Sequence, residues 1–365
     1  MDSAPIREAI LVPGSGDPLR PVAGEPLLVR TILALERGGI ERCTLVGPLR
    51  PPADDRIRCA VAAAPTLAPA ADDRLRLVVP VGTVIDSALV RDLQARARPD
   101  EVVDVESDGA RVRIAPGRLL TAGEGRAVRP RAGTLRQAGA PGIEADLLRA
   151  LDNPRDGYLD RVLHRRLSRP LTRLLLATPV SPNVVTIVGI LLGTAGGLLL
   201  GVPGPSVIAA LLLLEASAVL DCSDGELARV RFAESRLGHW LDVAGDTVVH
   251  VAVLAGISIR IAHTGVAPGR AVLVALLLGV LAAFAVITWS EETAERRVRA
   301  GGWENRVLDG VLSPLTTRDW HVFPIAFALA GRLDVLVPAA AIGAQIFWVV
   351  GVALLWRTLA RAPCA

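Results

Sequence analysis

The sequence predicts two parts of different fold class: an amino-terminal α/β domain and a carboxy-terminal α-helical integral membrane domain of six transmembrane helices. The mean hydropathy is +0.44 and 51% of the 365 residues are hydrophobic, which is high for a soluble chain. Charges are mixed among apolar residues up to about residue 156, whereas long apolar runs begin at Val184. We therefore expect domains at 1–150 and 181–365, joined by a juxtamembrane segment at 151–180.

The first 150 residues alternate short apolar runs with helical patterns. Ala9–Val12, Thr44–Val46 and Leu75–Val79 have the length and composition of strands. Leu27–Arg37 has the spacing of a helix, and proline-rich stretches such as 47–53 indicate loops. This alternation predicts a layered α/β domain.

The juxtamembrane segment contains an amphipathic pattern. Residues 159–178 place apolar residues at helical spacing with five arginines on the other side. Such a pattern is typical of a helix lying in the membrane interface, with anionic headgroups as its partner. Alternatively, some of these arginines attract an anionic, phosphorylated substrate.

The remaining residues predict six membrane spans. A spanning helix needs about 20 apolar residues. The segments that meet or approach this length are 184–202, 206–224, 240–261, 271–289, 320–331 and 335–356. The fifth is short.

Arginine placement predicts the orientation of the spans. Most arginines near the spans fall at one set of ends, and only three fall at the other: Arg260, Arg270 and Arg332. By the positive-inside rule, both termini and the arginine-rich ends face the cytoplasm of a bacterial-type membrane. Trp289, Trp320 and Trp356 lie where interfacial anchors belong.

The net charge argues against a nucleic-acid-binding protein, and the cysteines argue against disulfides. The net charge is +3, and membrane topology accounts for the arginines, so we expect no nucleic acid partner. The four cysteines lack metal-ligand spacing, and a cytoplasmic setting argues against disulfides. We expect free thiols.

Four aspartates lie within or beside apolar helices between Leu220 and His250. A charged side chain at membrane depth costs about 3 kcal/mol on insertion scales, so such residues are typical of functional sites. At helical spacing, one face of the first helix carries Asp221, Asp224, Gly225 and Ala228, and one face of the next carries Gly238, Asp242 and Asp246.

Carboxylates that converge from two helices need a cation. Oxygen-only ligands favour hard ions, so the pattern predicts Mg²⁺ or Mn²⁺. The glycines and the alanine leave room on the same faces for a bulky ligand. A metal and open space together indicate a nucleotide diphosphate.

These residues resemble a known signature. The pattern Asp221-x2-Asp224-Gly225-x2-Ala228-Arg229-x8-Gly238-x3-Asp242-x3-Asp246 is similar to that of the CDP-alcohol phosphotransferase family at all eight fixed positions. Ser181-Pro182-Asn183-x2-Thr186 is similar to the family's entry to its first span. The resemblance covers about residues 153–360.

The resemblance implies a six-helix enzyme with a cytoplasm-facing site. A phosphoalcohol group would pass from a CDP-alcohol donor to an acceptor alcohol, with release of CMP, in phospholipid or polyol-phosphate synthesis. Asp246 would be the catalytic base. Metal ligands would be Asp221, Asp224, Asp242 and Asp246, and donor-binding residues would be Gly225, Ala228, Arg229, Gly238, Asn183 and Thr186. The resemblance also allows a homodimer.

Two other interpretations remain open. The aspartates could be helix-end carboxylates paired with nearby arginines such as Arg229 and Arg231. They could instead relay ions in an ion-coupled membrane transporter. The adjacent position of the two acidic helices and the lack of an inverted repeat disfavour the transporter.

The amino-terminal domain carries a second resemblance. The stretch 10–28, with its Gly14-Ser15-Gly16 loop, is similar to the strand, glycine loop and helix of Rossmann-like sugar-phosphate nucleotidyltransferases. Fusion to such a membrane half resembles bifunctional inositol-phosphate cytidylyltransferase/di-inositol-phosphate-phosphate synthases. However, Glu25-Pro26 stands where that family has a lysine, and 80–83 has a threonine in place of a metal-binding aspartate. We therefore expect an inactive domain.

The sequence says less about the identity of the acceptor alcohol than about the reaction. The fused domain favours inositol phosphate or another polyol, with glycerol phosphate or a lipid alcohol as rivals. Relatives that make phosphatidylinositol phosphate place an arginine after the last motif aspartate, whereas this chain has Thr247.

Overall fold

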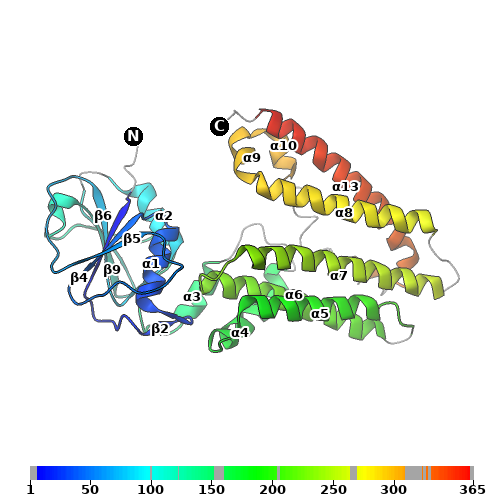
Figure 1. The fold of residues 1–365 in the computed structure, drawn as a ribbon, viewed down its shortest axis with the longest axis horizontal. Helices are drawn as coiled ribbons and strands as arrows, with labels where there is room; N and C mark the ends of the chain where they lie inside the picture. Colours follow the sequence, from blue (N-terminus) through cyan, green and yellow to red (C-terminus); the bar gives the residue numbers. More distant parts are fainter. Residues whose placement is uncertain are drawn as a thin grey trace. The chain divides into compact units, whose positions relative to one another are not determined.

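The computed structural model describes residues 6–98, 101–121, 123–151, 160–203, 206–263, 269–308, 323, 326–327 and 330–361. The chain divides into two compact units (Figure 1). The α/β unit comprises residues 1–152 with 173–179 and 226–233, and the helical unit comprises 153–172, 180–225 and 234–365.

The α/β unit is built on a seven-stranded mixed sheet with strand order β10-β8-β9-β6-β1-β4-β5. Its strands are β1 (Glu8–Val12), β4 (Arg42–Val46), β5 (Ala60–Ala64), β6 (Leu75–Pro80), β8 (Val103–Ser107), β9 (Ala110–Pro116) and β10 (Arg126–Val128). β1 pairs in parallel with β4 and β6, and β4 pairs in parallel with β5. The β9 strand runs antiparallel to β6 and β8, and β10 runs parallel to β8.

Shorter elements complete this unit. They are β2 (Pro21–Val22), β3 (Glu25–Pro26), β7 (Thr83–Ile85), β11 (Leu135–Gln137), α1 (Leu27–Arg37), α2 (Ser87–Arg96), a 3-10 turn at Gly117–Leu119 and α3 (Ile143–Arg149). The β2 strand pairs with β3, and β7 with β11. The predicted α/β class of this part of the chain is confirmed.

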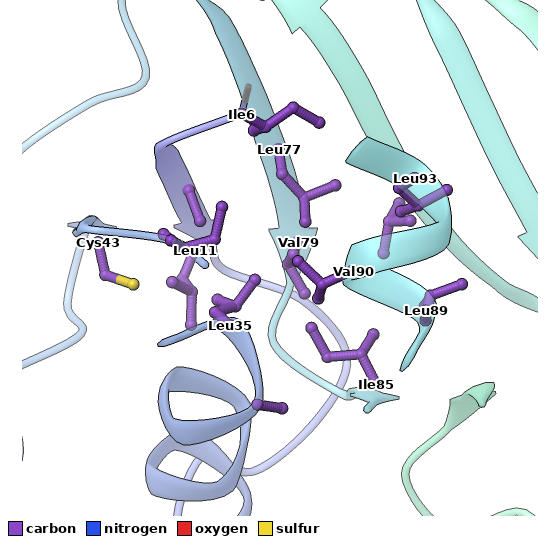
Figure 2. Packing of buried hydrophobic residues seen from close by; sticks show 14 of the residues in the cluster. Ile6, Leu11, Leu35, Cys43, Leu77, Val79, Ile85, Leu89, Val90 and Leu93 are labelled. Carbon is purple, nitrogen blue, oxygen red and sulfur yellow. The ribbon is translucent and has the colours of Figure 1, made fainter. Parts of the chain in front are cut away.

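One apolar core holds the sheet and its helices together. Leu77 and Val79 of β6 and Leu11 of β1 lie among side chains of α1 and α2 such as Leu35 and Leu93 (Figure 2). Five of the six β6 residues are buried, as expected of a strand covered on both faces. Each fully buried leucine contributes about 1.5–3 kcal/mol, so this unit has a substantial core of its own.

The carboxy-terminal half is entirely helical where it is described. A π-helical turn at Asp160–His164 leads into α4 (Arg165–Leu176), followed by α5 (Pro182–Leu199), α6 (Ser206–Val230), α7 (Arg236–His263), α8 (Arg270–Glu292), α9 (Ala294–Ala300), α10 (Gly302–Val307) and α13 (Leu333–Arg361).

Four of the described helices are long and apolar enough to cross a membrane: α5, α7, α8 and α13. The α6 helix, over the second predicted span, has 25 residues but carries Glu215, Asp221 and Asp224. Most of the fifth predicted span, 320–331, lies outside the described residues. The helical class of this half is therefore confirmed, with four candidate spans, and six spans remain a prediction.

Glycines bring α5 and α7 into close contact. Gly193 and Gly197 lie four residues apart on α5, and Cβ atoms on them would lie 2.7 Å from Val249 and 2.6 Å from Val253 of α7. A Cβ atom on Gly256 of α7 would lie 2.0 Å from the carbonyl oxygen of Gly197, a distance that no side chain tolerates. This is the small-residue packing that membrane helices use, because close backbone approach replaces the hydrophobic driving force.

The juxtamembrane helix packs with its polar side inward. Every fourth residue is buried: Asp160, His164, Ser168 and Thr172. The Ser223 hydroxyl of α6 donates to the Val219 carbonyl over 2.9 Å and lies 3.4 Å from the Ser168 carbonyl oxygen. Apolar side chains are exposed on this helix, namely Val162, Leu163 and Leu167. Arg165 is buried, unlike its exposed neighbour Arg166, so the arginines do not all share the outer side as predicted. The interfacial position of this helix stays a prediction.

Candidate active site

The acidic motif lies on either side of a short connection between two long helices. Asp221 and Asp224 are in the last three turns of α6, which ends at Val230. The α7 helix begins at Arg236 and carries Asp242 and Asp246 in its first three turns. Because the chain reverses between the two helices, their acidic ends are at the same end of the unit.

The structure brings three of the four aspartates together. One carboxylate oxygen from each of Asp221, Asp242 and Asp246 lies within 4.8 Å of the others. Oxygen ligands of Mg²⁺ at about 2.1 Å can lie up to about 4.2 Å apart, so small side-chain rotations would close this group on one ion. Asp221 and Asp242 are half-buried and Asp246 is exposed, which leaves the group open on one side.

Asp224 differs from the other three aspartates. Its side chain is buried, and its carboxylate is not part of the group within 4.8 Å. Its position one turn after Asp221 places it on the same side of α6. Its role as a metal ligand stays a prediction.

The amino-terminal end of α5 also reaches this region. A Cβ atom on Gly238 would lie 3.0 Å from Oδ1 of Asn183, so any larger residue at 238 would crowd that amide. Thr186 is buried and its hydroxyl donates to the Pro182 carbonyl over 3.2 Å. Asn183 is thus beside the motif, whereas the Thr186 proton is used within α5.

The remaining predicted donor-binding residues are on α6. Gly225, Ala228 and Arg229 are all half-buried. Ala228 and Arg229 fall within the 226–233 segment, which belongs to the α/β unit. Their predicted roles are not tested by this geometry.

A second polar cluster escaped the sequence analysis. Nδ1 of His164 is 2.8 Å from Oδ1 of Asp160, and Nε2 is 3.0 Å from Oε2 of Glu215. Burial alone would lower the pKa of His164, but the hydrogen bonds with Asp160 and Glu215 raise it to about 9. The Cys222 thiol lies 3.9 Å from Oδ1 of Asp160. The i,i+4 spacing of Asp160 and His164 was visible in the sequence, but their proximity to α6 was not.

In the α/β unit, backbone fills the space at the glycine loop. A Cβ atom on Gly14 would lie 2.0 Å from the Val81 carbonyl oxygen, and the Gly16 N–H donates to that same oxygen over 3.3 Å. Glu25 accepts two hydrogen bonds from Arg56, at 2.9 and 2.7 Å. The loop and the residue at the lysine position are therefore both engaged within the protein.

Comparisons with known proteins agree with the motif. The model of the CDP-alcohol phosphatidyltransferase family matches residues 179–361. A bifunctional IPC transferase and DIPP synthase of Thermococcus kodakarensis is 39% identical over 100 residues, which is 27% of this chain and 22% of that protein. A phosphatidylinositol phosphate synthase of Mycobacterium tuberculosis is 33% identical over 100 residues, 27% of this chain and 46% of that protein.

A solved structure also shows limited similarity to this chain. The crystal structure of the Mycobacterium tuberculosis phosphatidylinositol phosphate synthase with CDP-DAG bound shares 22% identity over 54% of this chain and 94% of that one, with a TM-score of 0.29. The chain spans less than half the length of the curated relatives described above. The family model, by contrast, matches 183 of the 365 residues (361 minus 178), and it includes the whole acidic motif. The chain therefore belongs to the CDP-alcohol phosphatidyltransferase family.

Proposed function

We propose that this protein is a membrane transferase that moves a phosphoalcohol group from a CDP-alcohol to an acceptor alcohol and releases CMP. The observation that carries the proposal is the convergence of Asp221, Asp242 and Asp246 from two helices of a family member. Like charges gathered in this way are unfavourable unless a cation joins them.

The donor set fits a hard divalent ion. Asp221, Asp242 and Asp246, with Asp224 nearby on α6, would hold Mg²⁺ or Mn²⁺ through carboxylate oxygens. When bound, the ion supplies charge neutralisation on the donor's diphosphate and on the departing CMP. We propose Asp224 as a ligand that joins on binding, because it is one turn from Asp221.

Asp246 is the proposed general base. Its side chain is the exposed member of the group, so an incoming hydroxyl can reach a carboxylate oxygen. That oxygen accepts the hydroxyl proton as the acceptor oxygen bonds to the phosphorus that carries the alcohol. The bond from this phosphorus to the oxygen bridging to the other phosphate breaks, and CMP leaves with that oxygen.

The residues around the carboxylates are proposed to bind the donor. Gly225, Ala228 and Gly238 leave space for the nucleotide, because none presents a side chain larger than a methyl group. Arg229 would pair with a phosphate oxygen. Asn183, beside Gly238, would offer its amide, and Thr186 would contribute its hydroxyl oxygen as an acceptor.

For the acceptor, we propose inositol phosphate or another polyol phosphate. Two of the similar proteins carry names of inositol-related synthases, which supports this class. The hydroxyl of Thr247, next to Asp246, donates to the Val243 carbonyl over 3.2 Å and supplies no positive charge. A phosphorylated acceptor would therefore depend on arginines elsewhere in the chain.

We infer that the α/β unit does not transfer nucleotides. The Gly16 N–H is bonded to Val81, and Arg56 is bonded to both Glu25 and Asp54, so neither is available to a phosphate. The full chain incubated with CTP and a polyol phosphate should release no diphosphate. Release of diphosphate would overturn this inference.

The proposed orientation places both termini and the acidic site on the cytoplasmic side. The arginine distribution around the spans supports it. A homodimer in the bilayer is proposed on the family resemblance alone.

The experiment that tests the function measures CMP release by the purified protein in detergent with Mg²⁺ or Mn²⁺. CDP-diacylglycerol, CDP-inositol and CDP-glycerol are each paired with inositol phosphate, glycerol phosphate and a lipid alcohol. One pair should release CMP, and Asp242→Asn should abolish release while Asp334→Asn, an exposed aspartate of α13, leaves it unchanged. No release from any pair, with cation-driven uptake into proteoliposomes, would replace the enzyme with a transporter.

A further inference from the structure

Three buried side chains with different donor atoms meet between the juxtamembrane helix and α6. Asp160 offers oxygen, His164 nitrogen and Cys222 sulfur, and these atoms lie within 4.8 Å of one another. The side chains are nearly inaccessible, with exposures of 5%, 0% and 3%. The cluster is therefore enclosed by protein, unlike the open carboxylate group.

The cluster is on a different face of α6 from the proposed active site. At about 100° per residue, Glu215 and Cys222 fall within about 20° of each other around the helix. Asp221 and Asp224 are about 120° and 180° away from Glu215 on the same count. One helix thus presents two sets of ionisable side chains in two directions.

The mixed donor set is typical of a borderline ion. Zn²⁺ takes sulfur at about 2.3 Å and nitrogen or oxygen at about 2.0–2.1 Å in a tetrahedron, so adjacent ligands lie about 3.3–3.5 Å apart. The observed separations are 2.8 Å from His164 Nδ1 to Asp160 and 3.9 Å from Cys222 Sγ to Asp160. Both differ from the tetrahedral values by about half an ångström, which side-chain rotation can supply.

Glu215 completes the pattern around the histidine. A metal-binding histidine usually donates its other ring N–H to a carboxylate, which fixes the ring. Here Nε2 of His164 is 3.0 Å from Oε2 of Glu215, while Nδ1 faces Asp160. An ion at Nδ1 would replace the proton on that nitrogen and leave the Glu215 hydrogen bond intact.

We propose that Asp160, His164 and Cys222 form a structural zinc site, with Glu215 as the carboxylate that orients His164. The ion would join the juxtamembrane helix to α6, next in sequence to Asp221. It would thereby fix the position of the helix that carries two of the four motif aspartates.

The test measures metal content of the full chain, purified in detergent through a tag without histidines, in excess Mg²⁺. Wild type should retain one Zn²⁺ per chain by mass spectrometry of the metal. Co²⁺ in its place should give a thiolate-to-cobalt charge-transfer band in the near ultraviolet. Cys222→Ser should abolish the band, and His164→Gln should release the zinc.

Matched controls separate this site from the other thiols and from the active site. Cys43→Ser and Cys59→Ser should keep the band, and Asp242→Asn should keep the zinc while losing CMP release. Size-exclusion profiles in detergent verify that the Cys222→Ser and His164→Gln variants are folded. Wild-type protein that takes up neither Zn²⁺ nor Co²⁺, or a band unchanged by Cys222→Ser, would overturn the proposal and leave a doubly protonated His164 held by two carboxylates.

Discussion

The two units surround their clustered charges differently. In the α/β unit, Asp104 accepts hydrogen bonds from Arg113 at 2.7 Å, from the Gly125 N–H at 2.8 Å and from Arg111. In the helical unit, Asp221, Asp242 and Asp246 gather with one another. A carboxylate surrounded by donors stabilises the fold, whereas carboxylates that lie close to one another repel and favour a shared cation. The difference distinguishes a charge that stabilises the fold from the charges that we propose to bind the metal.

The largest expected effect is on catalysis. Asp246→Asn should reduce CMP release by about 10²–10⁴-fold, because the amide cannot accept the acceptor's proton. Binding of the CDP-alcohol, measured by calorimetry with Mg²⁺, should weaken far less than turnover falls, because Asp221, Asp224 and Asp242 would still hold the ion. Asp334→Asn is the control in the same unit. Turnover at the wild-type rate in Asp246→Asn would remove its role as base.

A corresponding change in the α/β unit should affect stability and leave catalytic chemistry intact. Asp104→Asn should lower the free energy of unfolding of that unit by about 3 kcal/mol, because two charge-assisted hydrogen bonds with arginines are lost. Its neighbour on the same strand, Glu106, is exposed, so Glu106→Gln should change stability by less than about 0.5 kcal/mol. Equal effects of the two substitutions would contradict the structural role of Asp104.

The measurement can be made on the full chain. Cys43 has no exposed surface in the core of the α/β unit, so its reactivity in denaturant, followed by peptide mass spectrometry, reports unfolding of that unit. All six tryptophans lie at or beyond residue 240, so their fluorescence reports the helical part. Asp104→Asn should make Cys43 reactive at a lower denaturant concentration and leave the tryptophan fluorescence transition unchanged.

The sequence could predict features that depend on local pattern. Strands near Ala9–Val12 and Leu75–Val79 and the helix Leu27–Arg37 were placed within a residue or two, because each is an apolar run or stripe of the right length. The convergence of Asp221, Asp242 and Asp246 followed from helical spacing and the reversal of the chain between the helices. In each case the relevant residues are close in sequence.

Features that depend on which helices are neighbours could not be predicted. Cys222 meets Asp160 across 62 residues and Glu215 meets His164 across 51, so no spacing rule could show either contact. The grouping of the Asp160, His164 and Cys222 donor atoms within 4.8 Å of one another is therefore visible only in the structure. Likewise, the β9 strand forms a local hairpin with β8, but its antiparallel pairing with β6 joins residues far apart in the sequence.

A glycine substitution in α7 tests whether its close contact with α5 stabilises the helical unit. Gly256→Val should destabilise the helical unit by about 2 kcal/mol, since the new Cβ would meet the Gly197 carbonyl oxygen. Gly343 of α13 has no atom within 4 Å of its would-be Cβ, so Gly343→Val is the matched control. The midpoint of tryptophan fluorescence on heating in detergent measures both. A midpoint unchanged by Gly256→Val would refute close packing of α5 on α7.

The smallest expected effect is a loss of stability of the α/β unit at low pH. Although burial favours the neutral form, hydrogen bonds from Arg113, Arg111 and the Gly125 N–H hold the pKa of Asp104 well below its usual range. A group whose folded pKa is depressed stabilises the fold above its unfolded pKa of about 3.9, and this stability is lost as the pH falls further.

The stability difference between wild type and Asp104→Asn should therefore be constant from pH 7 to about pH 5 and shrink by about 1 kcal/mol at pH 3. Cys43 reactivity toward dithiodipyridine, which reacts with thiols also in acid, measures this difference in denaturant. Glu106→Gln, compared with wild type over the same range, shows how much of the pH dependence is general. A difference that stays constant down to pH 3 would mean that folding does not change the pKa of Asp104. The arginines around Asp104 would then not stabilise its charged form.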